Sequence, residues 1–234
     1  MNGMDIDLNS DLGEGCGLDG ELMPLLTSAN ICCGMHAGDL ATSYAALGLA
    51  GRDGVAVGAH PGFEDRAHFG RRELDLTEDQ VYFLCLYQVG GLIALARDLD
   101  LSIRYVKPHG ALYNQACRDD RYARAVAEAA EVLGLPLLGL PGTRMEALAS
   151  LRCRFVPEGF ADRRYLPDGT LVPRSRPDAM VKDPEEAVRQ AEWLISTKGV
   201  RSLCVHGDNP EALAFVRSLR YELQHRGHTL RAFA

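Results

Sequence analysis

Short apolar runs alternate with longer amphipathic stretches along nearly the whole chain. Apolar runs of four to eight residues, bounded by turn-forming residues, are typical of buried β-strands. The pattern predicts strands at residues 4–9, 55–60, 102–108, 135–140, 154–158, 202–206 and 229–233.

Four longer stretches have apolar residues at helical spacing, and they cover residues 77–99, 121–133, 183–197 and 210–226. Thr77 stands three residues before Gln80, the spacing of a capping box. Asp183 precedes a proline and two glutamates, which is a typical helix start because acidic groups stabilise the positive end of the helix dipole.

Strands that alternate with helices predict an α/β protein with a parallel sheet and helices packed outside it. Seven strands can close into a barrel or lie open as a doubly wound sheet. The barrel is favoured because polar motifs follow most of the strands, not only the two beside a switch point. No linker or internal repeat divides residues 1–234, so we expect a single domain.

One segment, residues 160–173, interrupts this alternation. It is charged and rich in turn residues, and Pro167-Asp168-Gly169 predicts a β-turn. We expect a hairpin insertion near the functional site.

Composition narrows the class of protein. The net charge of −7 argues against nucleic acid as a partner. The seven cysteines form no CxxC pair, which argues against a zinc knuckle or a dithiol redox site and indicates a reducing compartment. The first residues resemble no signal peptide, and no apolar run approaches 18 residues, so we expect a cytoplasmic protein that does not enter a membrane.

Polar groups crowd the glycine-rich turn after the first predicted strand. Asn9, Asp11 and Glu14 are placed to point into a cleft at the strand end, where a carboxylate serves as a base or a metal ligand. A tight turn with local side-chain hydrogen bonds would explain the same residues without any function. Residues 15–20 match GxGxxG, but they do not lead from a strand directly into a helix, and no P-loop occurs.

Histidines follow several predicted strands. His60, His109 and His206 each end an apolar strand and precede Pro or Gly, a coincidence that packing alone does not predict. Lys107 and His109 are two residues apart and so face the same side of a strand. Lysine at such a position can neutralise a carboxylate or stabilise an oxyanion.

Other charged residues accompany these histidines. His36 and Asp39 lie in a run of small residues that lets the backbone approach a ligand, although a lone histidine is more often structural. The charged residues at 65–72, after the second predicted strand, suit an anion site, although a solvated loop would have the same composition. The further candidates for substrate binding are Arg71, Glu158, Asp162, Arg163 and Asp208.

Seven motifs occur together in one order: DLNSDLGEG, SANICCGMHAGD, GAHPGFEDRAHFGRR, VKPHGALYN, EGFADRRY, GTLVPRS and CVHGDNP. This set closely resembles the family of 5-oxoprolinase A subunits, also called the lactam-utilisation or LamB/YcsF-like family. The resemblance extends from about residue 6 to residue 220. Met35 departs from it, because the family usually has Phe in its CGFHAGD motif.

The resemblance implies a distorted seven-stranded (β/α) barrel similar to the glycoside hydrolase/deacetylase superfamily. It implies ATP-dependent cleavage of 5-oxoproline to L-glutamate by a complex with subunits B and C. Under this interpretation Asp11 with His60 or His109 moves protons, and Lys107 neutralises developing charge. Arg71 or Arg163 holds a carboxylate or phosphate, and His206 completes the catalytic set.

Two alternatives remain. A metal-dependent deacetylase acting on an amide of a sugar would use Asp11, His60 (or His36) and His109 as metal ligands. Lys107 beside His109 argues against a bound cation. A protein that binds a sugar or an amino acid without catalysing its conversion is the second alternative.

Overall fold

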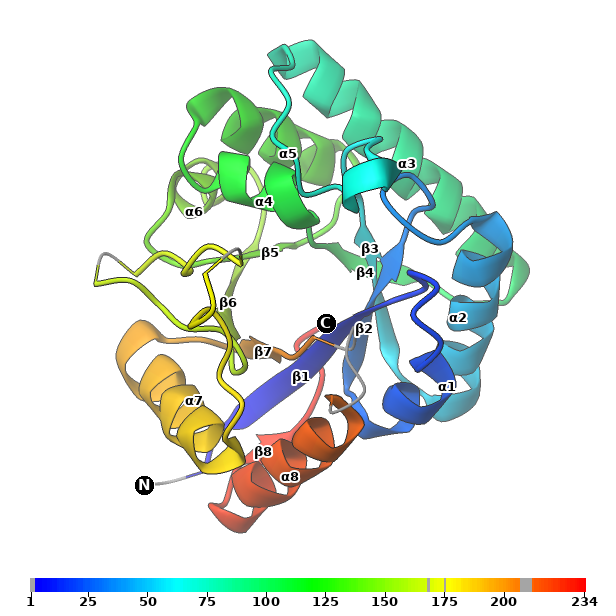
Figure 1. Ribbon diagram of the computed structural model, residues 1–234. Helices are drawn as coiled ribbons and strands as arrows, with labels where there is room; N and C mark the ends of the chain where they lie inside the picture. The colour runs from blue at the N-terminus through cyan, green and yellow to red at the C-terminus, as the bar shows by residue number, and fades with distance from the viewer. Residues whose placement is uncertain (1–2, 168, 175, 207–211) are drawn as a thin grey trace.

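The computed structural model describes residues 3–167, 169–174, 176–206 and 212–234. Seven parallel strands form its centre, in the order β2-β3-β4-β5-β6-β7-β1, and β2 also pairs with β1. That additional pairing closes the sheet, so the predicted barrel is confirmed (Figure 1). The strands are β1 (Asp5–Leu12), β2 (Ser28–Cys32), β3 (Ala56–His60), β4 (Ile103–Val106), β5 (Leu137–Gly139), β6 (Phe155–Phe160) and β7 (Ser202–Cys204).

The strand prediction was wrong in two places. The pattern missed β2, whose inward positions carry Ser28 and Asn30 instead of apolar side chains. It also assigned a barrel strand to residues 229–233, where β8 (Thr229–Leu230) pairs only with β1, outside the closed ring. Seven barrel strands are present, but they are not the seven predicted.

Helices surround the barrel (Figure 1). The four predicted helices are confirmed within a few residues, and Thr77 and Gln80 do form a capping box. They are α3 (Glu78–Asp98), α5 (Asp120–Val132), α7 (Pro184–Lys198) and α8 (Ala212–His225). Sequence patterning did not identify α1 (Asp19–Leu22), α2 (Leu40–Asp53), α4 (Gly110–Ala116), α6 (Arg144–Ala149) or the 3-10 turns η1 (Met23–Leu25) and η2 (Arg66–His68).

By length and composition alone, α3 is apolar enough to cross a membrane. In the structure it is one of the helices around the barrel, and its buried residues include Val81, Cys85 and Val89. Burial accounts for only part of its apolar surface, since Phe83 and Tyr87 are exposed, and a single helix of this kind is weak evidence for a membrane span.

The side chains inside the barrel are largely polar. Asp7, Asn9 and Asp11 alternate along β1 and point inward, whereas Ile6 and Leu8 pack in the core between strands and helices. Asp7 accepts hydrogen bonds from the hydroxyls of Thr27, Ser28 and Ser202. Burial is the largest influence on the pKa of Asp7 and raises it to about 6, despite these hydrogen bonds.

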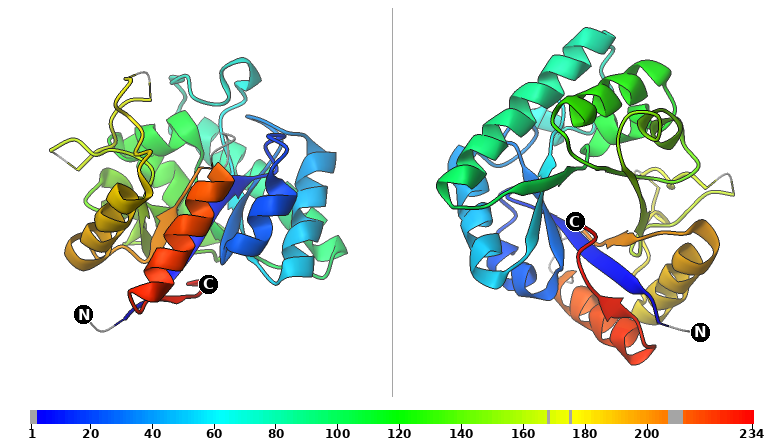
Figure 2. Two further views of the ribbon diagram at one scale, coloured as in Figure 1. Left: turned by 60° about the horizontal axis from the view of Figure 1, so that its bottom comes forward. Right: turned by 180° about the vertical axis from the view of Figure 1, so that it is seen from behind.

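The end of the barrel near the N-termini of the strands is closed by apolar side chains. Tyr105, Leu138 and Val156 form a small buried cluster against which Phe233 packs. Gly58 makes room for Tyr105, because a Cβ atom at this position would lie 2.2 Å from the tyrosine ring. Viewed from behind, the C-terminus lies across this end of the barrel (Figure 2).

The opposite end carries long connections. The segment that follows β6 and the segment that follows β3 project from the same end of the barrel (Figure 2). The first contains the predicted hairpin, in which Tyr165 and Leu171 form an antiparallel bridge and Leu166 N–H donates to the Thr170 carbonyl at 2.8 Å. The centre of the predicted β-turn, residue 168, lies outside the described residues.

Candidate functional site

A cavity of about 680 Å³ opens where the carboxyl ends of the strands meet. Parallel α/β barrels place their active sites at this end, because every strand delivers its following loop there. Among the predicted residues, those that line the cavity are Asp11, Glu14, His60, Arg71, Lys107, His109, Arg163 and His206. The structure therefore gathers side chains from almost the full length of the sequence.

Lys107 lies at the floor of the cavity and is only 2% exposed. Its Nζ lies 2.9 Å from Glu158 Oε1 and 3.0 Å from Asp11 Oδ1, and it also contacts Asn9 and the Cys204 thiol. Burial alone would lower the pKa of Lys107, but Asp11, Cys204 and Glu158 outweigh it and raise that pKa well above its usual value. Lys107 is therefore a fixed positive charge and not a base.

Asp11 connects Lys107 to the histidines. Its Oδ1 accepts hydrogen bonds from Asn30 and Lys107, and its Oδ2 lies 3.3 Å from His60 Nε2. Burial tends to raise the pKa of Asp11, but the interactions with His60 and Lys107 are stronger together and hold it well below its usual range. Asp11 therefore stays ionised at neutral pH.

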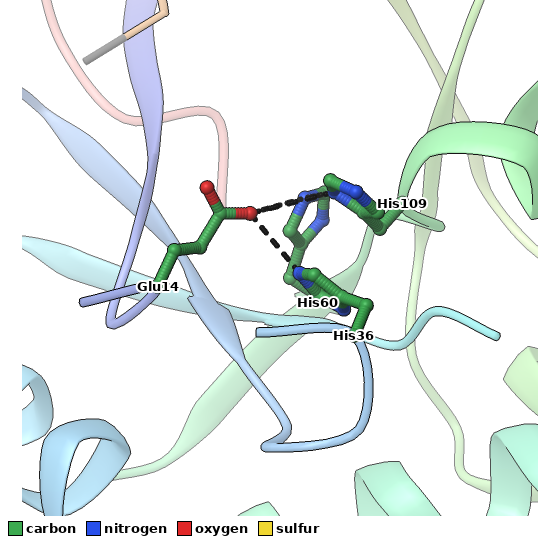
Figure 3. A group of neighbouring side chains, drawn as sticks. All are labelled: Glu14, His36, His60 and His109. Atoms are coloured by element: carbon green, nitrogen blue, oxygen red, sulfur yellow. Dashed lines mark hydrogen bonds and ion pairs between the residues drawn. The ribbon is translucent and has the colours of Figure 1, made fainter. Parts of the chain in front are cut away.

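Three histidines and Glu14 converge from four different loops and strand ends (Figure 3). Glu14 Oε1 lies 3.0 Å from His36 Nε2 and 3.4 Å from His109 Nδ1. The rings of His36 and His109 stack at 3.7 Å between centroids, almost parallel. These four residues, named the histidine cluster below, are grouped closely enough to hold a metal ion.

Neighbouring groups give the clustered histidines different charges. Burial tends to lower the pKa of His36, but hydrogen bonds to the Cys32 thiol and the Glu14 carboxylate raise it to about 9. Burial, together with repulsion from His36 and His60, lowers the pKa of His109 well below its usual value. His36 is therefore protonated and His109 neutral at pH 7.

A second imidazole site faces the cavity from the end of β7. His206 Nδ1 lies 2.8 Å from Asp162 Oδ2, and the same carboxylate accepts a hydrogen bond from the backbone N–H of His206. Burial tends to raise the pKa of Asp162, but its contacts with His206 lower it. The ionised Asp162 thus fixes the orientation of His206.

Arginines lie in the upper wall of the cavity. Arg163 is 6% exposed, and its Nε has no hydrogen-bond partner among the described residues. Burial lowers the pKa of Arg163 to about 10, and the positive charges of Arg174 and Arg71 act in the same direction. Guanidinium groups are the type of side chain that binds a carboxylate or phosphate.

The remaining predicted residues differ in how closely they approach the cavity. Asn9 is buried in the barrel interior beneath it, and His36 lies behind His109. Asp39 is not brought to the cavity, because its carboxylate caps α2 by accepting a hydrogen bond from Thr42 N–H. Asp208 lies outside the described residues.

Sequence reasoning missed several residues of the cavity wall. Tyr113 and Asn114 follow His109 on α4, and Arg174 lies beyond the hairpin. Tyr113 OH donates to the buried Glu158 carboxylate at 3.2 Å. Each of the three stands in one of the motifs quoted above, VKPHGALYN or GTLVPRS, which was the only available signal.

Known proteins resemble this chain over almost its full length. The model of the LamB/YcsF family matches residues 6–234. A protein of Neisseria meningitidis serogroup C, named as the A subunit of 5-oxoprolinase, is 46% identical over 93% of this chain and 95% of that protein. The crystal structure of a lactam utilization protein from Thermus thermophilus superposes with a TM-score of 0.90 at 43% identity, covering 98% of this chain and 100% of that one.

A more distant structural neighbour shows the fold alone. The catalytic domain of a peptidoglycan N-acetylglucosamine deacetylase from Eubacterium rectale superposes with a TM-score of 0.55 at 10% identity, covering 98% of this chain and 88% of that one. This similarity bears out the predicted likeness to deacetylase barrels and says nothing about chemistry. The match to almost the entire family model, together with near-full-length relatives, shows that the chain belongs to the LamB/YcsF family.

Proposed function

We propose that this chain is the A subunit of a 5-oxoprolinase, which opens 5-oxoproline to L-glutamate at the expense of ATP together with subunits B and C. The observation that carries the proposal is a single cavity that combines an oriented imidazole, His206, with a buried arginine, Arg163. A small cyclic amide that bears a carboxylate needs one group of each kind. The name of the relatives that are about 46% identical supports the same activity.

The substrate carboxylate is assigned to Arg163. Its guanidinium is fixed by a hydrogen bond from Nη2 to the Val172 carbonyl, while Nε has no described partner. A carboxylate that accepts from a guanidinium forms a charge-assisted hydrogen bond, which is stronger than a neutral one. Arg71, over the ring of Phe69, adds positive charge to the same wall.

Proton transfer is assigned to His206. Asp162 accepts from Nδ1–H, so Nε2 is the nitrogen that can take a proton from an attacking water. The ring of Phe160 stacks on His206 with centroids 5.8 Å apart and limits its rotation. Asp11 with His60 or His109 is the second candidate for proton transfer, and Lys107 beneath them compensates negative charge at the cavity floor.

ATP is assigned to the partner subunits, because the sequence contains no P-loop. The lactam oxygen would take the γ-phosphoryl group of ATP with ADP as the leaving group, which makes the carbonyl carbon a better electrophile. Water would then add to this carbon and the ring C–N bond would break with protonation of the nitrogen. Hydrolysis of the resulting acyl phosphate would release glutamate and phosphate. The arginine wall would then hold the phosphate as well as the carboxylate. We place the complex in the cytoplasm, in keeping with the reducing compartment that the cysteines indicate.

The test is glutamate release from 5-oxoproline and ATP by the chain alone and by the chain with its B and C partners. We expect glutamate only from the complete mixture. A His206→Gln chain should lower the rate by about 10²–10⁴-fold, the usual contribution of general acid–base catalysis. His225→Gln, which changes an exposed histidine on α8, is the matched control. A complete mixture that releases no glutamate would contradict the proposal.

For the deacetylase alternative, the comparison with known proteins shows a similarity of fold only. The same preparations, incubated with an N-acetylated sugar, provide its test. Release of acetate without ATP or partners, combined with no release of glutamate, would favour this alternative.

A further inference from the structure

The inner nitrogens of His60 and His109 carry an inference that goes beyond the proposed function and does not depend on it. Nδ1 of His60 lies 2.8 Å from the backbone carbonyl oxygen of Lys107. Nε2 of His109 lies 2.8 Å from the carbonyl oxygen of Phe69. A carbonyl oxygen can only accept, so each of these nitrogens carries the hydrogen. In the neutral form of each ring, the second nitrogen therefore carries a lone pair.

Those two lone pairs face each other. His60 Nε2 lies 3.0 Å from His109 Nδ1. In these tautomers of the neutral rings neither of the two nitrogens carries a hydrogen, so neither can donate to the other. Carboxylate oxygens surround the same point: Glu14 Oε1 is 3.4 Å from His109 Nδ1 and 3.9 Å from His60 Nε2. Asp11 Oδ2 lies 3.3 Å from His60 Nε2. Four acceptors that converge in this way repel one another unless a proton or a metal cation lies between them.

The surrounding structure holds these acceptors in place. His36 stacks on His109 and donates to Glu14, so it fixes both the ring and the carboxylate. Gly70 packs directly against the two side chains, since a Cβ atom there would lie 2.7 Å from His36 Cβ and 3.0 Å from His109 Cδ2. Backbone carbonyls that orient histidine ligands and neighbours that support ligating carboxylates are the usual surroundings of a metal site.

We propose that His60 Nε2, His109 Nδ1 and Glu14 Oε1 bind one divalent transition-metal ion such as Zn²⁺, with Asp11 Oδ2 beside them. Two imidazole nitrogens bound to one tetrahedral zinc at about 2.0–2.1 Å lie about 3.3 Å apart, close to the 3.0 Å between these two nitrogens. Two imidazoles and a carboxylate are ligands that zinc and neighbouring metals accept. Figure 3 shows the three groups pointing toward a common centre.

The lysine that argued against a cation in the sequence is not an obstacle in the structure. Lys107 Nζ is directed toward Glu158 and Asp11, and the two carboxylates compensate its charge. The proposed ligands also line the large cavity, so an ion held by them would face it and could bind water or a substrate oxygen.

The test is metal binding by the full-length chain, prepared metal-free and titrated with Zn²⁺ by calorimetry and with Co²⁺ by visible absorption. We expect one equivalent of either ion to bind. His109→Gln and Glu14→Gln should each weaken binding by at least about 10²-fold. The matched control is His68→Gln, because His68 pairs with Asp65 outside the histidine cluster and should leave binding unchanged.

X-ray absorption of the Zn²⁺-loaded wild-type chain tests the ligands without any substitution. Two imidazoles with oxygen ligands are the expected set, whereas thiolate ligands would overturn the proposal. A metal-free chain that binds neither ion in the titrations would also overturn it, and the contact between His60 and His109 would then be held by a shared proton.

Discussion

Lys107 Nζ lies 2.9 Å from Glu158 Oε1, and both side chains are buried inside the barrel. Lys107 belongs to a loop after β4 and Glu158 to the middle of β6, so their contact joins strands on different sides of β5. Because Lys107 also bonds Asp11, one ammonium compensates two carboxylates in a site that is nearly closed to water.

We expect Lys107→Met to destabilise the fold by about 3–5 kcal/mol, because it leaves buried carboxylates without a counter-charge. Urea unfolding measures the loss. Lys182→Met, at an exposed position, is the matched control and should change stability by less than about 0.5 kcal/mol. The double variant Lys107→Met/Glu158→Gln should recover part of the loss, and equal stability of the single and double variants would contradict the ionic role.

Asp7 should make stability fall as the pH rises from 4 to 6. Its folded-state pKa of about 6 lies above the unfolded value, so the folded state binds the extra proton in this range and loses it at higher pH. The rise from 3.8 to about 6 corresponds to about 3 kcal/mol. Asp7→Asn should remove this dependence in urea unfolding measured across the range, whereas Asp5→Asn on the exposed end of β1 should retain it.

Asp162→Asn should lower the turnover of the complete A–B–C mixture by about 10²–10⁴-fold, because an amide no longer selects the same tautomer of His206. A positioning role predicts a fall in kcat with little change in KM. It also predicts a shifted pH profile of kcat/KM. An Asp162→Asn chain that keeps its kcat but loses affinity would instead make Asp162 a binding residue.

Arg163→Gln should raise the KM for 5-oxoproline by about 10–100-fold. This change corresponds to the loss of one hydrogen bond to a charged group. Thermal melting should show little loss of stability, because burial already disfavours the charge of Arg163. Arg189→Gln, on the exposed face of α7, is the control for removing a guanidinium. Unchanged KM in the Arg163 variant would reassign the carboxylate to another group.

Gly58→Ala should destabilise the barrel by about 1–3 kcal/mol or more, because the new Cβ meets the Tyr105 ring at 2.2 Å. The matched control is Gly48→Ala on the exposed side of α2, where nothing lies within 4 Å of the added carbon. That change should be neutral or stabilising by up to about 1 kcal/mol. Equal stability of both variants would contradict the role given to Gly58.

The sequence pattern predicted an element correctly where the buried positions of that element carry apolar side chains. The helix that begins after Thr77 was identified because its cap and apolar spacing are local features. Strand β2 was missed because Ser28 and Asn30 face a polar barrel interior, where hydrogen bonds replace apolar contacts. A pattern that equates inward positions with apolar residues fails for such a strand.

Some residues of the candidate site were predicted correctly from the sequence, and others were not. His60, His109 and His206 were singled out because each follows an apolar strand, and all three line one cavity. Asp39 stood in an equally polar motif, yet the start of α2 uses it as a helix cap. No local pattern distinguishes a carboxylate that caps a helix from one that faces a ligand.

The sequence by itself determined the α/β class, the polar strand ends and the set of residues from which a site could be built. These properties depend on the order of neighbouring residues, which the sequence states directly. Only the tertiary structure decided that Lys107 is compensated by Asp11 and Glu158, and that the inner nitrogens of His60 and His109 face each other. Closing the barrel brings together side chains that are far apart along the chain, and their charges and hydrogen bonds depend on that proximity.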